Sequence, residues 1–296
     1  MEQKNPAPGF LATCWTTAGD VMPLRTGPLS PIPLRQRIQA AAEAGYTGIG
    51  FGIEDVVSAR DEHGYRQIEA MLLDHGLNHL ELEYLDSWWT DTPEATATRT
   101  ALLEASSALG AHHIKVGAGL LGQIVDKGSL QERLHALAEQ AARAGVKIAL
   151  EAAAFSMLPN IQRAAELVRA VDHPNAGLLL DIWHIYRGGT PYGALGDIVS
   201  PGSIFAVELD DGLALPSENL YEDTFDHRKL CGHGDFDVVA FIKTVRALGY
   251  TGPWGVEMMS IDHRRLEPEK AARLALGAAA DCFTAAIPTS IERISS

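Results

Sequence analysis

The sequence has few cysteines and few basic residues, and each shortage excludes a class of protein. Its three cysteines, Cys14, Cys231 and Cys282, are too few and too far apart for a disulfide framework or a CxxC metal site. Lysine and arginine number 24 against 38 aspartates and glutamates, which gives a net charge of -14. Because this charge repels a phosphate backbone, we expect no nucleic-acid partner.

Long apolar runs are also missing. No stretch reaches the roughly 18 consecutive apolar residues that a membrane-spanning helix needs. Residues 1–9 lack the basic segment followed by an apolar one that marks a secretory signal. We therefore expect a cytoplasmic protein with no membrane partner. Apolar residues make up 46% of the chain and charged residues 21%, an ordinary globular composition that excludes global disorder.

Short apolar segments alternate with longer amphipathic ones along the whole chain. The segments that predict strands buried on both faces of a parallel sheet are 10–16, 48–52, 79–84, 112–116, 147–151, 177–181, 204–209 and 254–258. The segments that predict helices are 34–44, 65–75, 94–109, 129–144, 160–171, 192–198, 237–248 and 267–286. Glycines such as Gly45 and Gly110 are placed to end a helix just before the next strand.

Strand–helix units repeated over about 250 residues predict an α/β fold, a (β/α)8 TIM barrel. We expect residues 1–296 to form a single domain of this kind. An open doubly wound sheet is the weaker alternative, because no GxGxxG motif follows a predicted strand. The loop at residues 211–236, after the seventh predicted strand, is the expected lid.

Acidic residues stand at the ends of the last four predicted strands, where a TIM barrel carries its active site. They are Glu151, Asp181, Glu208 and Glu257. Any one of them could form a buried ion pair. Four together would repel one another, and a divalent cation is the simplest way to hold them. Carboxylate oxygens favour Mg²⁺, Mn²⁺ or Co²⁺ over a soft-ligand zinc site.

Longer motifs surround these acids. They are LEAAAF at 150–155, LLLDIWHIYRGG at 178–189, VELDDG at 207–212, EDTFDHR at 222–228, HGDFD at 233–237 and GVE at 255–257. Over nearly the whole chain, this combination resembles the xylose-isomerase-like TIM-barrel superfamily, the sugar phosphate isomerase/epimerase family. That superfamily also contains inosose and dehydroshikimate dehydratases and endonuclease IV.

The resemblance implies four metal ligands: Glu151, Asp181, Glu208 and Glu257. Glu208 departs from the superfamily, whose ligand at that position is usually histidine. A fourth carboxylate calls for a neighbouring cation, for which Lys115, Arg228 and a protonated His184 are the candidates; otherwise Glu208 is protonated or outside the ligand shell. A second departure is Ala153, where many members carry a histidine that can act as a base.

These residues predict a metal-dependent isomerase or epimerase. The metal would polarise a carbonyl and an adjacent hydroxyl, and the pair Glu151 and Glu257 would move the neighbouring proton by way of an enediolate, with His184 as a third catalytic residue. The alternative is a lyase that eliminates a β-substituent from a 3-keto-glycoside, a dehydroshikimate-like or an inosose-like substrate, with His184 or His227 as the acid. A non-catalytic barrel stays open because of the two departures, whereas the net charge disfavours an endonuclease.

The expected partner is a small carbohydrate, and a homo-oligomer or hetero-oligomer is compatible with the sequence. Residues near the predicted strand ends that could bind this substrate are Trp15, Tyr84, Trp88, His113, Lys115, His227 and Arg228. Aromatic rings there could stack on the CH faces of a sugar, and Arg228 could bind an oxygen or a phosphate. The alternatives are core packing for Trp15 and a surface ion pair for Arg228.

Overall fold

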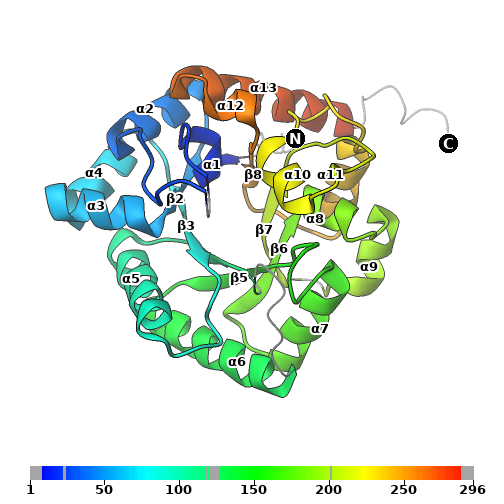
Figure 1. Ribbon diagram of the computed structural model, residues 1–296, viewed down its shortest axis with the longest axis horizontal. Helices are drawn as coiled ribbons and strands as arrows, with labels where there is room; N and C mark the ends of the chain where they lie inside the picture. Colours follow the sequence, from blue (N-terminus) through cyan, green and yellow to red (C-terminus); the bar gives the residue numbers. More distant parts are fainter. Residues whose placement is uncertain (1–8, 23–24, 118, 120–126, 201, 288–296) are drawn as a thin grey trace, which may run out of the picture.

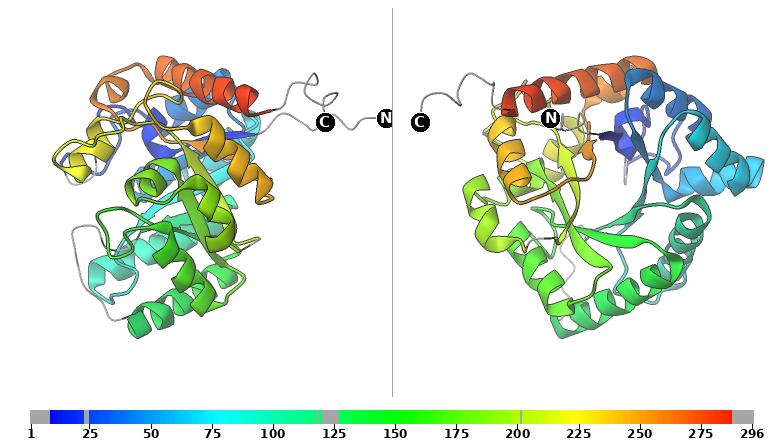
Figure 2. Two further views of the ribbon diagram at one scale, coloured as in Figure 1. Left: turned by 90° about the vertical axis from the view of Figure 1, so that its right-hand side faces the viewer. Right: turned by 180° about the vertical axis from the view of Figure 1, so that it is seen from behind.

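A closed barrel of parallel strands forms the centre of the molecule. The computed structural model describes residues 9–287 except 23–24, 118, 120–126 and 201. The strands pair in chain order from β1 to β8, and β1 also pairs with β8, which closes the barrel. Helices surround it on all sides (Figures 1 and 2). The predicted (β/α)8 TIM barrel is confirmed.

The elements follow the order expected from the alternating segments. The strands are β1 (Phe10–Ala12), β2 (Gly48–Gly52), β3 (His79–Leu85), β4 (His113–Val116), β5 (Lys147–Glu151), β6 (Ala176–Asp181), β7 (Ile204–Leu209) and β8 (Trp254–Val256). The long helices are α2 (Leu34–Ala44), α3 (Ile53–His63), α4 (Tyr65–Asp74), α5 (Pro93–Leu109), α6 (Lys127–Ala144), α7 (Ile161–Val171), α11 (Val238–Ala247) and α13 (Pro268–Ala286). The short ones are α1 (Cys14–Thr17), α8 (Ile182–Arg187), η1 (Tyr192–Ala194), α9 (Leu195–Ile198), α10 (Leu220–Asp226) and α12 (Ile261–Arg264).

Helix ends explain why several of these bounds could be predicted. Gly45 ends α2 at φ 105° and Gly110 ends α5 at φ 66°, left-handed conformations that glycine adopts without a steric penalty. Asn160 begins α7 by accepting a hydrogen bond from the Arg163 backbone N–H. None of the described helices combines the length and the apolarity needed to cross a bilayer.

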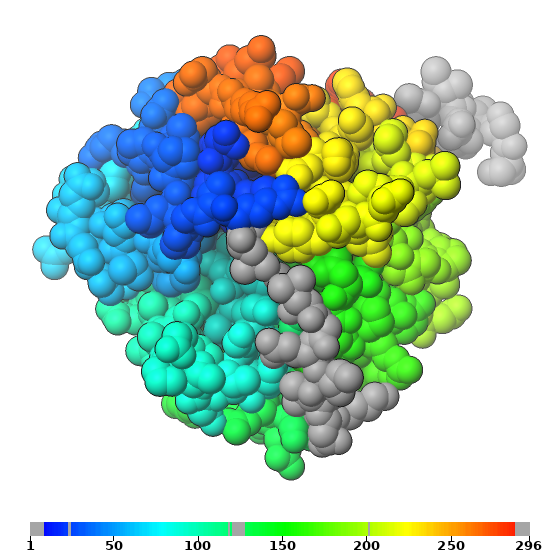
Figure 3. All heavy atoms as spheres, viewed as in Figure 1, coloured from blue at the N-terminus to red at the C-terminus, as the bar shows by residue number. Residues whose placement is uncertain are grey.

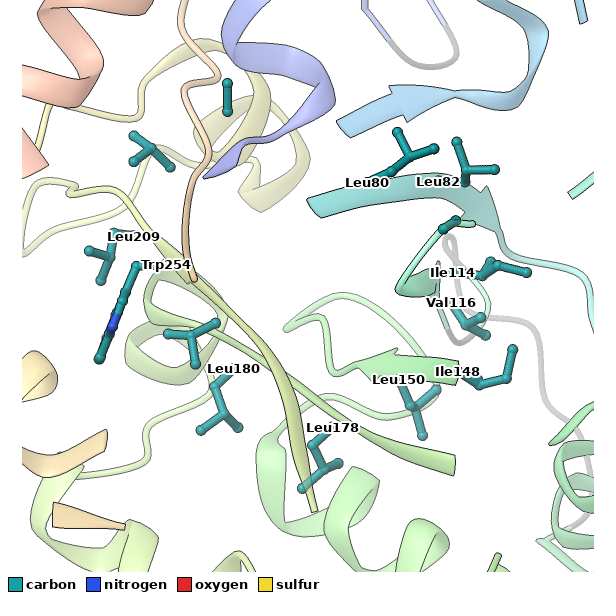
Figure 4. Close-up of a cluster of buried hydrophobic side chains, with 14 of the residues drawn as sticks. Leu80, Leu82, Ile114, Val116, Ile148, Leu150, Leu178, Leu180, Leu209 and Trp254 are labelled. Carbon is teal, nitrogen blue, oxygen red and sulfur yellow. The ribbon is translucent and has the colours of Figure 1, made fainter. Parts of the chain in front are cut away.

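Successive strand residues face opposite sides of the barrel wall. Leu80 and Leu82 of β3 point outward and belong to the large apolar core between strands and helices (Figure 4). Glu81 and Glu83 alternate with them and are buried on the inner side. The sequences of parallel strands that are buried on both faces are normally apolar throughout. The alternation of acids and leucines in β3 therefore shows that part of the barrel interior is polar.

The loops that follow β1 and β7 meet over the carboxyl end of the barrel. Arg25 of the first loop lies 2.5 Å from Asp226, the last residue of α10, and 3.8 Å from Glu222 in its first turn. Figure 3 shows these segments, blue and yellow, in contact on the face that the viewer sees in Figure 1. The predicted lid segment 211–236 therefore contains α10 and lies at this end; its opening or closing stays a prediction.

Candidate active site

Four acids meet at the carboxyl end of the barrel. Glu151 and Asp181 are the last residues of β5 and β6, Glu208 is the penultimate residue of β7, and Glu257 directly follows β8. Asp181 and Glu208 are direct neighbours across the β6–β7 pairing. One carboxylate oxygen of each acid lies within 4.8 Å of the others. We call these four residues the carboxylate cage.

Lys115 supplies a positive charge to this cage from the inner face of β4. Its Nζ lies 2.5 Å from Glu257, 2.9 Å from Glu208, 3.5 Å from Glu83 and 3.7 Å from Glu151. Burial alone would lower the pKa of Lys115, but the surrounding carboxylates outweigh it and raise the pKa well above its usual value. Lys115 is therefore an ammonium ion at neutral pH.

Arg228 supplies a second positive charge from the loop after α10. Its Nη1 lies 2.9 Å from Asp181 and 3.0 Å from Glu257, and it also pairs with Asp210. Its Nε and Nη2 donate to the hydroxyl of Thr224 at 3.2 and 2.8 Å. The guanidinium is thus fully engaged with buried protein groups, and the surface ion pair considered from the sequence is instead a buried one.

The charges of the cage leave room for a divalent cation. Without a metal, burial raises the pKa values of Glu151 and Glu208 well above the usual one. A bound metal requires the carboxylates to be ionised, and four ionised carboxylates against Lys115 and Arg228 leave a formal charge of -2, which one divalent ion would neutralise. Glu83 and Asp210 lie beside the same two cations, and burial raises the pKa of Glu83 to about 7 and that of Asp210 well above its usual value. These two acids therefore add less than their full charge near neutral pH.

Unpartnered atoms give a second test of whether the residues fit a metal. Glu151 Oε1 and His184 Nδ1 are buried and have no hydrogen-bond partner among the described residues. Oxygens that bind one Mg²⁺ at about 2.1 Å lie about 3.0 Å apart when adjacent and about 4.2 Å apart when opposite, so the cage oxygens, all within 4.8 Å of one another, would draw closer together around the ion. The donor set fits a hard divalent cation.

Asp181 both belongs to the cage and begins α8. Its Oδ1 accepts from the backbone N–H of Trp183 at 2.6 Å and of His184 at 3.2 Å, while its Oδ2 accepts from Arg228. This cap places the His184 Nε2 3.9 Å from Glu151 Oε1. Burial and then Arg228 lower the pKa of His184 well below its usual value, so neutral His184 is not the balancing cation.

A cavity of about 400 Å³ opens onto one side of the cage. Six of the predicted site residues line it: Trp15, Tyr84, Lys115, Glu151, His184 and Glu257. Apolar walls come from Met22, Phe155, Phe225 and Met259. Gly117 of the next loop has no side chain, which lets Tyr84 lie over it, since a Cβ there would be 1.6 Å from the Tyr84 hydroxyl.

Other predicted substrate contacts lie elsewhere. Trp88 is fully buried, and its Nε1 donates to the Gly117 carbonyl at 2.5 Å, so it stabilises a loop. His113 faces the barrel interior at the start of β4 and contacts Glu81 at 2.7 Å. His227 is exposed at the end of α10. None of the three lines the cavity, and Arg228 reaches the cage but not the cavity. Substrate contact by these residues stays a prediction.

Sequence reasoning missed three acids that matter to the site. Glu83 lines the cavity beside Lys115, Asp210 pairs with Arg228, and Asp55 lines the cavity and holds the buried Arg37 at 2.5 Å. The signal for Glu83 was present, because acids and leucines alternate along Glu81-Leu82-Glu83. Strict alternation on a predicted barrel strand places the polar residues on one face.

Fold and site together define a TIM-barrel protein with a buried acidic centre at the carboxyl ends of its strands. Residues 38–282 match the family described as xylose isomerase-like TIM barrel, and the chain belongs to this family.

The relatives of this chain are enzymes. A 3-dehydroshikimate dehydratase of Pseudomonas aeruginosa is 29% identical over 246 residues, which cover 80% of this chain and 38% of that protein. An inosose isomerase of Halalkalibacterium halodurans is 30% identical over 151 residues, 50% of this chain and 52% of that one. The chain thus matches only about a third to a half of the length of these relatives.

Solved structures share the fold. An IOLI protein with a bound zinc atom superposes with a TM-score of 0.77 at 20% identity, over 95% of this chain and all of that one. The 3-keto-D-glucoside 4-epimerase of E. coli superposes with a TM-score of 0.68 at 18% identity, over 93% of this chain and 99% of that one.

Proposed function

We propose that this protein is a divalent-metal-dependent isomerase or epimerase that moves a proton next to the carbonyl of an uncharged polyol ketone. The observation that carries the proposal is the carboxylate cage, with its two fixed cations, at the wall of the cavity. The names of the relatives, which include an isomerase, an epimerase and a dehydratase, support chemistry next to a carbonyl group.

The cage residues Glu151, Asp181, Glu208 and Glu257 would hold the metal. A divalent ion bound there would supply Lewis-acid polarisation of the substrate carbonyl and an adjacent hydroxyl. The zinc in the IOLI structure supports a metal in this fold. The four carboxylates, in contrast to nitrogen or sulfur ligands, favour Mg²⁺, Mn²⁺ or Co²⁺.

Glu151 is the better-placed base of the two cage acids that line the cavity. Its Oε1 has no hydrogen-bond partner among the described residues, whereas Glu257 Oε1 accepts from Lys115 at 2.5 Å. Burial raises the pKa of Glu151, and Glu257 and Asp181 raise it further, against the opposing effect of Lys115. A carboxylate with a raised pKa accepts a proton more readily, so Glu151 removes it and Glu257 lies ready on the other side.

Lys115 and His184 assist without exchanging the proton. The ammonium of Lys115 lines the cavity and can donate to a substrate oxygen that gains negative charge. His184 stands beside Glu151 and orients it. Because His184 is neutral with a lowered pKa, it protonates a leaving group poorly, which favours isomerisation over elimination.

The cavity lining favours an uncharged substrate. Its acidic residues are Glu54, Asp55, Glu83, Glu151 and Glu257, and Lys115 is the single basic residue among the described residues that line it. That ammonium already serves several carboxylates. A phosphate or carboxylate group would therefore enter a field of its own sign with no lysine or arginine free to pair with it.

A lyase is the second candidate, because the dehydratase relative matches the chain over a longer stretch than the isomerase does. The two reactions separate in one experiment. The protein, treated with EDTA and reloaded with Mn²⁺, is incubated in D₂O with an inosose, a 3-keto-glucoside, 3-dehydroshikimate and a ketose phosphate. Products are read by mass spectrometry and NMR.

We expect turnover of an uncharged ketone, with conserved skeletal mass and deuterium next to the carbonyl, only when Mn²⁺ is present. Loss of water would establish the lyase. Turnover restricted to the two anionic substrates would contradict the uncharged substrate class. A product without deuterium, formed at full rate, would argue for an intramolecular hydride shift in place of proton transfer.

A further inference from the structure

Three histidines gather at the amino end of the barrel, opposite the cavity. His79 is the first residue of β3, His113 is the first residue of β4, and His112 directly precedes it. The backbone N–H of His112 donates to the Leu80 carbonyl at 2.8 Å, which fixes the two segments side by side. We call His79, His112 and His113 the histidine trio; Figure 2, right, views the molecule from this end.

The imidazole rings converge. The ring centroids of His79 and His112 are 4.2 Å apart, those of His112 and His113 5.5 Å, and those of His79 and His113 5.9 Å. One ring nitrogen of each lies within 4.8 Å of the other two. The Nδ1 atoms of His112 and His113 are 3.3 Å apart. Two nitrogens bound to one tetrahedral zinc at about 2.05 Å would be about 3.3 Å apart, so this pair already has the required spacing.

Glu81 orients one of these rings. Its Oε2 lies 2.7 Å from His113 Nε2, inside the barrel. Burial raises the pKa of Glu81 to about 7. When Glu81 is ionised, His113 donates to it through Nε2–H, and the His113 Nδ1 then presents its lone pair toward His112 Nδ1, where a metal would bind. A carboxylate that fixes the outer nitrogen of an imidazole is the usual partner of a metal-binding histidine.

The trio is neutral and reachable from solvent. Burial is the largest cause that lowers the pKa of His79 to about 3, of His112 to about 4 and of His113 to about 3. His79 and His112 are only half-buried. Lys147 carries a positive charge that would oppose a bound cation. It stands beside His113 in the β4–β5 pairing and contributes to the lowered pKa values of all three histidines.

We propose that the histidine trio is a second metal site, separate from the carboxylate cage, that binds Zn²⁺. Three imidazole nitrogens suit zinc and its transition-metal neighbours and discriminate against Mg²⁺ and Ca²⁺. Glu81 strengthens the site as the partner of His113, and Lys147 weakens it by repulsion. The proposal does not depend on the proposed function, because it is read out by metal content alone.

The experiment uses the full chain with the cage disabled by Glu151→Gln and Glu257→Gln. Protein freed of metal is equilibrated with Zn²⁺ or Co²⁺, and bound metal is measured by elemental analysis and calorimetry. We expect one equivalent in this background, none after adding His112→Asn, and one after adding His63→Asn, a half-buried histidine on α3 that serves as the matched control. Unchanged zinc content after His112→Asn overturns the proposal.

Two further variants test the site without removing a ligand. Glu81→Gln should weaken zinc binding by about 10–100-fold, and Lys147→Met should tighten it severalfold. X-ray absorption of the zinc-loaded background should show nitrogen ligands at about 2.0–2.1 Å. A shell of oxygens alone, or affinities that do not change in either variant, would also overturn the proposal. Circular dichroism confirms that each variant is folded.

Discussion

The two ends of the barrel interior gather different side chains, and β3 and β4 contribute polar residues to both. On β4, His113 belongs to the histidine trio at the amino end, and Lys115, two residues later, reaches the carboxylate cage. On β3, Glu81 contacts His113, and Glu83 faces Lys115. The three imidazoles thus lie on or beside β3 and β4, whereas the four cage carboxylates come from β5–β8. The two sites that we propose would therefore offer nitrogen ligands at one end and oxygen ligands at the other, which prefer different metals.

On β5–β7, across the barrel from β3 and β4, an apolar layer lies on the amino-end side of the cage. Each of three cage acids is preceded, two residues earlier, by a residue of a small buried cluster: Ala149 before Glu151, Leu179 before Asp181 and Ala206 before Glu208. Side chains in a TIM barrel fill the interior in layers contributed by alternate residues. The cage thus rests on carbon atoms along β5–β7, whereas the polar column that links both ends is confined to β3 and β4.

Glu151→Gln should disable the site at the carboxyl end without affecting the histidine trio, and it should have the largest effect on turnover. It removes the proposed base and one negative charge of the cage, so we expect turnover to fall by about 10²–10⁴-fold. Elemental analysis should show that bound Mn²⁺ is lost. Glu54→Gln, which changes another acid lining the cavity outside the cage, is the control and should retain the metal. Equal metal content in both variants would place the site elsewhere.

Replacing Lys115 or Lys147 compares the two ends of the barrel through the free energy of unfolding. Lys115→Met leaves buried Glu208 and Glu257 without their closest cation, which should destabilise the metal-free protein by about 3–5 kcal/mol. Added Mn²⁺ should restore more stability to this variant than to the wild type. Lys147→Met removes a charge that faces imidazoles and should cost far less. Urea unfolding in EDTA measures both; equal stability of the two variants would contradict this account of the interior.

His184→Ala should have a smaller effect and leave the metal in place. The Nε2 of His184 lies 3.9 Å from Glu151 Oε1, and we propose that it orients this carboxylate once substrate and metal are bound, so we expect turnover to fall by about 10–100-fold. Metal content, measured on the same sample, should stay near that of the wild type. Complete loss of the metal would instead show that His184 is itself a ligand.

Elements bounded by clear sequence signals were predictable to the residue. The strands 48–52, 147–151 and 204–209 and the helix 34–44 have the predicted bounds, because a glycine or proline stands at the start of each or within the two residues before it. The expected strand 10–16 was too long. Residues Cys14–Thr17 form a one-turn helix instead. In this helix the Thr16 hydroxyl donates to the Val256 carbonyl at 2.6 Å, and a local sequence pattern cannot predict a contact between residues 240 positions apart.

The cage was predictable for a different reason than the rest of the site. Each of its acids ends an apolar strand, so the fold class alone brings them together. The histidine trio joins His79 to a pair more than 30 positions later, and only the β3–β4 pairing makes them neighbours. The positions of Trp88 and His227 outside the cavity could not be predicted because both residues follow a strand or helix in a loop, where the side-chain direction depends on tertiary contacts and not on a sequence period.

The smallest expected effect concerns Glu83, the acid of β3 at the carboxyl end. Both its oxygens lack a hydrogen-bond partner among the described residues, and burial raises its pKa to about 7 despite Lys115. The folded protein then holds a proton that the unfolded chain, with an ordinary glutamate, releases near pH 4.5. Stability from this group is present below about pH 4.5 and is lost as the pH rises through about 7.

Glu83→Gln cannot lose that proton, so in EDTA its urea midpoint should fall less than that of the wild type between pH 4.5 and 8. Glu94→Gln, at an exposed position on α5, should follow the wild type. Parallel curves for wild type and Glu83→Gln would mean that Glu83 is ionised throughout this range and that Lys115 offsets its burial completely.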